Sequence, residues 1–116
     1  MSKINVKILG TSHEITNVNL ADDLMSRIIG LMFKKSLTGM SGLLIKPCNS
    51  IHTFFMFFDL DVLFISSSGE IVKIIRGMKP WRMTWIYLRA SQVLELKAGS
   101  LPRDVESGMK VEVIHV

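Results

Sequence analysis

Cys48 and His52 are the pair of side chains in this 116-residue sequence whose types suit a soft metal site or a thiol nucleophile with its base. Met56 continues the same four-residue spacing. In an extended strand Cys48 and His52 would lie about 13 Å apart, so they meet only if the residues between them form a turn or a helical bend. The alternative is a buried thiol and a hydrogen-bonded core histidine. We expect no metal, because a tetrahedral site would need His13 or His115 from near the two ends of the chain.

Asp61 is the third candidate catalytic residue, and with His52 and Asp59 it interrupts a dense apolar stretch. A buried carboxylate is costly without partners, so Asp61 is expected to accept from backbone N–H groups or to pair with an arginine. A strand from His52 to residue 58 alone covers about 20 Å, so a dyad of His52 and Asp61 requires the chain to fold back closely. We therefore favour a structural role for Asp61 over a catalytic one.

A basic and aromatic segment contains no acidic residue between Glu70 and Glu95. Its cations are Lys73, Arg76, Lys79, Arg82 and Arg89, and they are interleaved with Trp81, Trp85 and Tyr87. Such a segment could hold an anion, and Arg76, Lys79, Trp81, Arg82 and Arg89 are the candidate ligand-binding residues. The alternative is a solvated face with extended basic side chains. The net charge of +4 is modest, so we do not expect nucleic acid as a partner.

The length predicts a single domain over residues 1–116. A single cysteine cannot form an internal disulfide, and the sequence has neither a visible signal peptide nor a run of about 18 apolar residues. We expect a soluble, cytoplasmic protein with no membrane span. Phosphate-loop, serine-hydrolase and zinc-protease motifs are all missing, and no cofactor is expected.

Alternating apolar residues predict a first hairpin from residues 3–9 and 14–19. Further short strands are predicted at residues 43–45, 71–75, 93–96 and 111–116, with an irregular or bent strand at 81–88. Two dense apolar runs, at residues 54–58 and 62–65, are predicted to be strands of the central sheet, because their large side chains need cover on both faces.

The apolar spacing changes to steps of three and four at residues 21–33, which predicts an amphipathic helix. Leu24, Ile28 and either Leu31 or Met32 are expected to face the core. Asp22 and Asp23 are expected to be exposed near the helix start, with Asn19 as the cap. Gly30 indicates a break or a close contact. The predicted fold is α+β, a mainly antiparallel curled or barrel-like sheet with one main helix.

Several motifs in this order resemble the family called domain of unknown function 192, in its branch without a signal peptide. They are Gly30-Leu31-Met32-Phe33, Ser41-Gly42-Leu43-Leu44, Cys48-Asn49-Ser50-Ile51-His52-Thr53 with Met56, Asp61-Val62-Leu63-Phe64, Pro80-Trp81-Arg82, and Val93-Leu94-Glu95-Leu96 with Gly99. The family usually has Gly-Asp where this chain has Gly108-Met109. The resemblance implies a compact β-rich fold and no established activity.

Two functions of different classes follow from these observations. The first is a non-catalytic binding or accessory protein, which would hold a small anionic ligand or a protein partner through a pocket near the helix end and the basic segment. The second is a small enzyme or metal site centred on Cys48, His52 and Asp61. A catalytic thiolate would need a depressed pKa at Cys48, and this requirement separates the two hypotheses.

Overall fold

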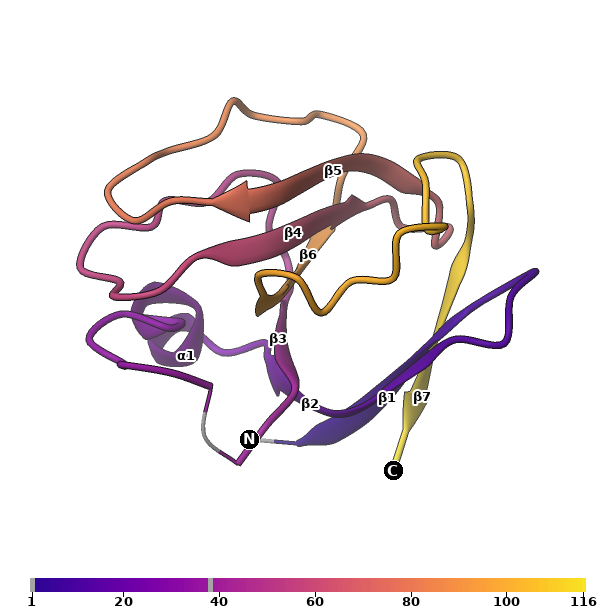
Figure 1. Ribbon diagram of the computed structural model, residues 1–116, viewed down its shortest axis with the longest axis horizontal. Coiled ribbons are helices and arrows are strands. Elements are labelled where there is room, and N and C mark those ends of the chain that lie inside the picture. The colour runs from indigo at the N-terminus through magenta and orange to yellow at the C-terminus, as the bar shows by residue number, and fades with distance from the viewer. Residues whose placement is uncertain (1, 38) are drawn as a thin grey trace.

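The computed structural model describes residues 2–37 and 39–116, and its strands join in a single curled sheet (Figure 1). The sheet has seven strands in the order β5-β4-β6-β3-β2-β1-β7. The elements are β1 (Lys3–Ile8), β2 (Glu14–Ala21), α1 (Leu24–Ile29), β3 (Gly42–Ile45), β4 (Leu60–Ile65), β5 (Ile71–Met78), β6 (Gln92–Lys97) and β7 (Val111–His115). The expected strands near residues 3–9, 14–19, 43–45, 62–65, 71–75, 93–96 and 111–116 are thus all present.

Neighbouring strands of the sheet are antiparallel except for β2 and β3, which are parallel and are joined through α1. The two edge strands approach each other at one end, where Glu70 and Lys110 form an isolated bridge. Next to it the Val111 amide donates to the Gly69 carbonyl over 2.8 Å. The prediction of a mainly antiparallel, curled sheet is therefore confirmed.

Both faces of the central strands are buried, so β4 has no exposed residue. Leu63, Leu94 and Leu96 belong to one core, which the β1–β2 hairpin and the residues around Leu101 complete. Val62 and Val93 belong to a second core on the opposite face. The middle of β6, residues 93–96, alternates between the two cores and is buried throughout, so a polar side chain there cannot reach bulk water on either side.

The predicted helix over residues 21–33 is much shorter in the structure, where α1 has six residues. Ala21 continues β2 and pairs with Ile45 of β3, so strand pairing takes the residues expected to begin the helix. Asn19 also lies in β2. Asp23 is the cap instead, and its carboxylate accepts from the Ser26 amide at 2.8 Å. The fold is mainly β, and the α+β class with one main helix is met only in part.

The apolar side chains of α1 face outward, contrary to the prediction that Leu24 and Ile28 face the core. Leu24 is 64% exposed and Ile28 is 57% exposed. Leu31, which follows the helix, is buried as predicted. Gly30 ends the helix with a positive φ, a conformation that residues with a Cβ atom disfavour. After this turn Leu31 packs in the second core. No helix in the described residues has the length and apolar content that a membrane crossing needs.

Residues 54–58 form turns and loop, so the prediction that they are a central strand is wrong. Met56 is buried, whereas Phe55 and Phe57 are exposed. The turn is fixed by Thr53, whose carbonyl accepts from the Met56 amide at 3.2 Å. Phe55 then packs on Phe33 and on Trp81, with ring centroids 5.3 Å and 4.8 Å apart. The aromatic rings therefore cover one another at the surface and do not enter the sheet.

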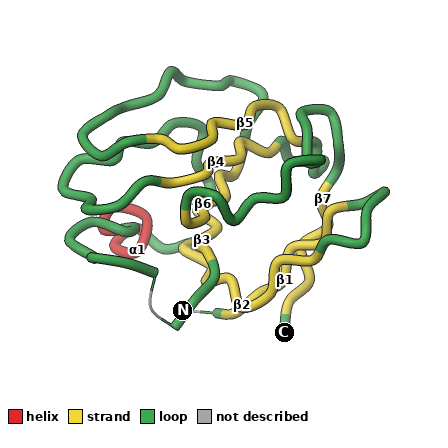
Figure 2. Tube along the Cα trace, viewed as in Figure 1, coloured by secondary structure: helices red, strands yellow, loops and turns green. Residues whose placement is uncertain are grey.

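Two long loops, residues 46–59 and 79–91, run beside each other (green in Figure 2). Backbone hydrogen bonds join them: the Thr53 amide donates to Arg82, and the Thr84 amide donates to Ile51. The Tyr87 amide donates to Asn49 in the same way. The first loop lies over the second core and faces α1, and the space between this loop, α1 and the sheet is the site described next.

Candidate functional site

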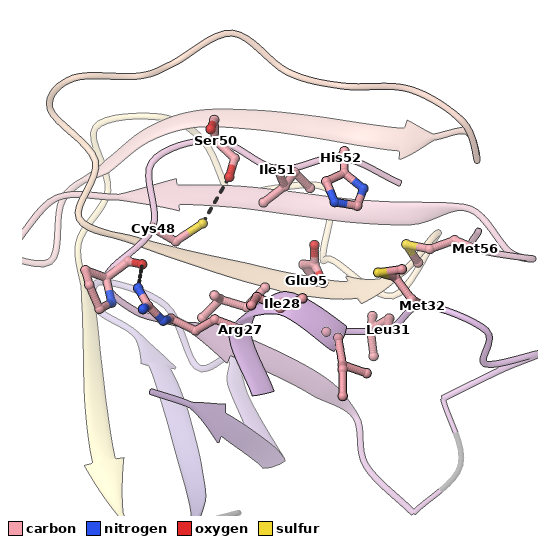
Figure 3. Close-up of a pocket in the computed structure, with 14 residues that line it drawn as sticks. Arg27, Ile28, Leu31, Met32, Cys48, Ser50, Ile51, His52, Met56 and Glu95 are labelled. Carbon is pink, nitrogen blue, oxygen red and sulfur yellow. Dashed lines mark hydrogen bonds between the residues drawn. The ribbon is translucent and has the colours of Figure 1, made fainter. Parts of the chain in front are cut away.

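A pocket opens between α1 and the loop 46–59, with β3 and β6 at its base (Figure 3). Its cavity volume is about 130 Å³. An apolar cavity of similar size holds a ligand of about six heavy atoms. The lining is mostly apolar, and its residues that can ionise are Arg27, Cys48, His52 and Glu95. Both residues of the predicted Cys48 and His52 pair are therefore part of one site.

Glu95 is the least expected residue of the site. It lies in β6 between Leu43 of β3 and Val62 of β4, and it is 3% exposed. Its carboxyl group faces the pocket between α1 and the segment that carries Ile51 and His52 (Figure 3). No residue in the described parts of the chain hydrogen-bonds to this carboxyl group. Burial raises the pKa of Glu95 to about 8, so the group is mainly neutral at pH 7.

Arg27 supplies a positive charge from α1. Its Nη1 donates to the Pro47 carbonyl over 3.2 Å, which ties the helix to the start of the loop 46–59. Its Nε is buried and has no hydrogen-bond partner within residues 2–37 and 39–116. The site thus contains two polar groups, Arg27 Nε and the carboxyl of Glu95, that the described chain leaves unpartnered.

Cys48 is half-buried in the pocket wall, and its thiol donates to the Ser50 carbonyl over 3.1 Å (Figure 3). Burial raises the pKa of the Cys48 thiol, and the negative charge that Glu95 can carry adds to the rise. The hydrogen bond to Ser50 and, less strongly, the nearby Arg27 lower the pKa of the thiol, but each does so by less than burial raises it. The thiol form is therefore favoured, whereas a nucleophilic cysteine requires the thiolate.

His52 lies exposed at the edge of the pocket and is not a core histidine. Its Nδ1 accepts a hydrogen bond from the Phe54 amide at 3.2 Å, and its ring stacks on Phe54 with centroids 4.8 Å apart. This hydrogen bond places the proton of the neutral ring on Nε2. Cys48 and His52 line one pocket, but in the described structure no hydrogen bond joins them.

Asp61 belongs to a different part of the molecule. Its carboxylate accepts from the backbone amides of Gly77, Gly99 and Leu101 at 3.0, 2.9 and 3.1 Å. The prediction that backbone N–H groups would satisfy this buried carboxylate is confirmed. A dyad of Asp61 with His52 is not formed. Within residues 2–37 and 39–116 no cluster of three His, Cys, Asp or Glu side chains is arranged to hold a metal ion.

The basic segment does not form a single cationic site, although no acidic residue lies within it in sequence. Lys79 pairs with Asp59 and Arg89 pairs with Glu70, each at 2.8 Å. The Arg76 guanidinium donates to the carbonyls of three residues between positions 101 and 105. Arg82 and Trp81 are exposed, and no ion pair involves Arg82 in the described residues. Folding thus provides the acidic partners that the local sequence lacks.

Sequence reasoning did not select Glu95 or Arg27 as site residues. The signal for Glu95 is an acidic residue within a short apolar strand, Val93 to Leu96, that is buried on both faces. The signal for Arg27 is weaker, because the sequence places this cation on the polar side of a helix. Both residues become recognisable as site residues only when their unpartnered atoms are seen beside one cavity.

The curled sheet, with a pocket between a short helix and a long loop, defines a small β-rich domain. The chain belongs to the DUF192 family, described as "Uncharacterized ACR", whose model matches residues 4–113. This confirms the resemblance found in the motifs. The family description states no activity.

Two archaeal relatives agree with this assignment. A UPF0127 protein of Pyrococcus horikoshii is 35% identical over 98 residues, which are 82% of this chain and 80% of that protein. A UPF0127 protein of Pyrococcus furiosus is 32% identical over 99 residues, 83% of this chain and 80% of that protein.

Two crystal structures share the fold. One, described as a candidate transcription regulator from Sinorhizobium meliloti, has a TM-score of 0.79 and 28% identity and covers 97% of this chain and 92% of its own. The other, a protein of unknown function from Novosphingobium aromaticivorans, has the same TM-score with 21% identity and covers 95% of this chain and 83% of its own.

Proposed function

We propose that this chain is a non-catalytic binding protein that takes a small ligand into the pocket between α1 and the loop 46–59. The observation that carries the proposal is the carboxyl group of Glu95, which is almost fully buried, faces the cavity and has no partner in the described chain. A buried polar group without a hydrogen bond costs free energy, roughly 1–3 kcal/mol. A ligand with a matching polar group would remove this cost.

The remaining pocket lining supports the same proposal. Leu31 and Met56 are buried side chains that fix the inner wall, and Ile28 and Ile51 add apolar surface near the opening. A mostly apolar cavity with a few convergent polar groups is the usual form of a small-molecule site. The site is built on a sheet whose two faces are packed, so its floor is held rigidly.

The alternative enzyme or metal site at Cys48, His52 and Asp61 receives less support. The Cys48 thiol donates to a carbonyl and has a raised pKa, the reverse of an activated nucleophile. His52 Nδ1 is occupied by a backbone amide, and the carboxylate of Asp61 is occupied elsewhere. A binding role requires none of these groups to be activated.

The basic segment is likewise a weaker candidate for the ligand site than the pocket. Arg76, Lys79 and Arg89 already have partners within the fold, and a ligand would have to compete with them. Arg82 and Trp81 remain available at the surface, where they would suit a protein partner more than an enclosed small molecule.

The proposal predicts that obstructing the pocket abolishes ligand binding without unfolding the protein. Ile28 lines the opening and is exposed, so Ile28→Trp would place a large ring across it. Binding is measured by thermal shift and by ligand-observed NMR against a panel of small metabolites, because a ligand that binds the folded state raises its melting temperature. We expect Ile28→Trp to weaken binding at least tenfold.

Leu24→Trp is the matched control, since Leu24 lies on the same helix with similar exposure but does not line the pocket. Ligands that bind the wild type should bind this variant equally. The proposal fails if no compound in the panel binds, or if the compounds that do bind are indifferent to Ile28→Trp.

A further inference from the structure

Two residues that line the same small cavity have polar atoms without a hydrogen-bond partner in the described chain. Glu95 provides a carboxyl group from β6, and Arg27 provides a guanidinium from α1 whose Nε lacks a partner among the described residues. The rest of the lining is mostly apolar, with Leu31, Ile51 and Met56 as examples. A ligand that satisfies this arrangement needs an acceptor group at one end and an apolar body.

The charge of the lining selects the sign of the ligand. The titratable groups that share the cavity with Glu95 are Arg27 from α1 and Cys48 and His52 from the loop 46–59. Arg27 is permanently cationic, the Cys48 thiol is protonated, and Glu95 is mainly neutral at pH 7. The cavity thus carries no fixed negative charge near neutral pH. An anion is favoured there over an ammonium group.

We infer that the ligand of this pocket is a small carboxylate with a short apolar chain, and that its carboxylate accepts a hydrogen bond from the carboxyl group of Glu95. This inference rests on the proposed function and adds the chemical class of the ligand. A carboxylic acid that donates to a carboxylate forms a charge-assisted hydrogen bond, which is shorter and stronger than a neutral one. Arg27 adds electrostatic attraction, and a cavity of about 130 Å³ limits the ligand to about six heavy atoms.

The inference makes binding depend on pH in one direction. Butyrate stays ionised between pH 6 and pH 9, whereas Glu95 loses its proton over this range. An ionised Glu95 can no longer donate, and it repels the bound carboxylate. With a pKa of about 8, about a tenth of the molecules keep the proton at pH 9, so affinity should fall about tenfold or more from pH 6 to pH 9.

The experiment titrates the full chain with butyrate and with n-butylamine by calorimetry or by NMR at pH 6 and pH 9. Butyrate is expected to bind at pH 6, and to bind about tenfold more weakly at pH 9. Butylamine is expected not to bind at either pH. Circular dichroism at both pH values checks that the protein stays folded.

Three variants identify the groups responsible. Glu95→Gln should retain some butyrate binding through its amide N–H but lose the pH dependence, whereas Glu106→Gln, at an exposed position outside the pocket, should behave as wild type. If Cys48 or His52 were the source of the pH effect, it would persist in Glu95→Gln. Arg27→Gln should weaken butyrate binding at both pH values and leave their ratio unchanged.

The failure of this inference and the failure of the proposed function give different results. If butylamine binds and its affinity rises with pH, the pocket is a ligand site but the ligand is a cation held by ionised Glu95. If butyrate does not bind at pH 6 while another compound of the panel does, the carboxylate class is wrong and the binding function stands. If no compound binds at all, both are wrong.

Discussion

Burial keeps a proton on Glu95 at neutral pH, and this proton links the stability of the fold to pH. The pKa in the folded protein is raised from an ordinary 4.5 to about 8. Between these values the folded state binds more protons than the unfolded state. Proton binding by Glu95 therefore stabilises the folded state fully below pH 4.5, and this stabilisation is lost as the pH rises through 8.

Glu95→Gln should remove this pH dependence while preserving the shape of the side chain. Urea unfolding from pH 5 to pH 9 should show the wild type losing about 4 kcal/mol of unfolding free energy relative to the variant. The variant should also be the more stable protein at pH 9. Glu106→Gln should follow the wild type, because Glu106 is exposed. Parallel pH profiles for the wild type and Glu95→Gln would disprove a raised pKa.

The two buried acids show what the sequence could predict at this scale. Asp61 interrupts an apolar block, and desolvation alone indicates that backbone amides or an arginine must satisfy it; three amides do so. Glu95 could not be assigned in this way, because a strand with one exposed face would place it in water. Its burial depends on the second core, which loops from distant parts of the sequence complete.

At the scale of elements, α1 has an apolar pattern typical of a buried helix face, but the side chains of that pattern are exposed. Leu24 and Ile28 recur at helical spacing, but the helix is short and turns its apolar stripe toward solvent and the pocket opening. The residue that anchors the segment is Leu31, which lies beyond Gly30 and is 2% exposed. The contribution of α1 to stability is thus concentrated after its last turn.

Truncations should reveal this distribution directly. Leu31→Ala removes a buried side chain and should destabilise the protein by about 2–5 kcal/mol. Leu24→Ala changes an exposed side chain and should alter the unfolding free energy by less than about 0.5 kcal/mol. Chemical denaturation monitored by tryptophan fluorescence measures both. A larger loss for Leu24→Ala than for Leu31→Ala would mean that the helix packs by its predicted face.

Strands were easier to predict than the segments between them. Period-two alternation and bounding glycines predict the β1–β2 hairpin and β7. The alternation is visible in these strands because each has one exposed face. The strand prediction for residues 54–58 was wrong because a run of aromatic residues is compatible both with a strand buried on two faces and with a loop. The outcome is decided by Thr53, Phe33 and Trp81, whose proximity the local sequence does not reveal.

At the scale of the whole molecule, the sheet is closed at one end by a contact between Gly69 and Val111. Gly69 has a φ of +88°, and a Cβ atom there would lie 2.6 Å from the Val111 carbonyl oxygen. The contact joins the turn before β5 to β7, the two edge strands of the sheet. It therefore ties together the parts of the molecule that are farthest apart in the strand order.

Gly69→Ala should destabilise the protein by about 2–4 kcal/mol, since a strained backbone conformation and a steric clash act together. Gly10→Ala is the matched control: Gly10 has a φ of +81°, but a Cβ atom there would meet no other atom within 4 Å, so only the strain of about 1 kcal/mol applies. Thermal and urea unfolding give both values. Equal losses would show that the Gly69 contact does not hold the sheet edges together.

Strand β1 lies between β2 and β7, and Ile4 of β1 is opposite His115 of β7 in an antiparallel register. The Val116 amide donates to the Lys3 carbonyl over 3.3 Å. A short peptide linking β7 to β1 would therefore make an ordinary β-hairpin, and opening the turn at Gly10 and Thr11 would leave β1 attached through β7 alone. The circularly permuted chain would have the same fold, with β1 as its C-terminal strand and therefore the last strand that the ribosome makes.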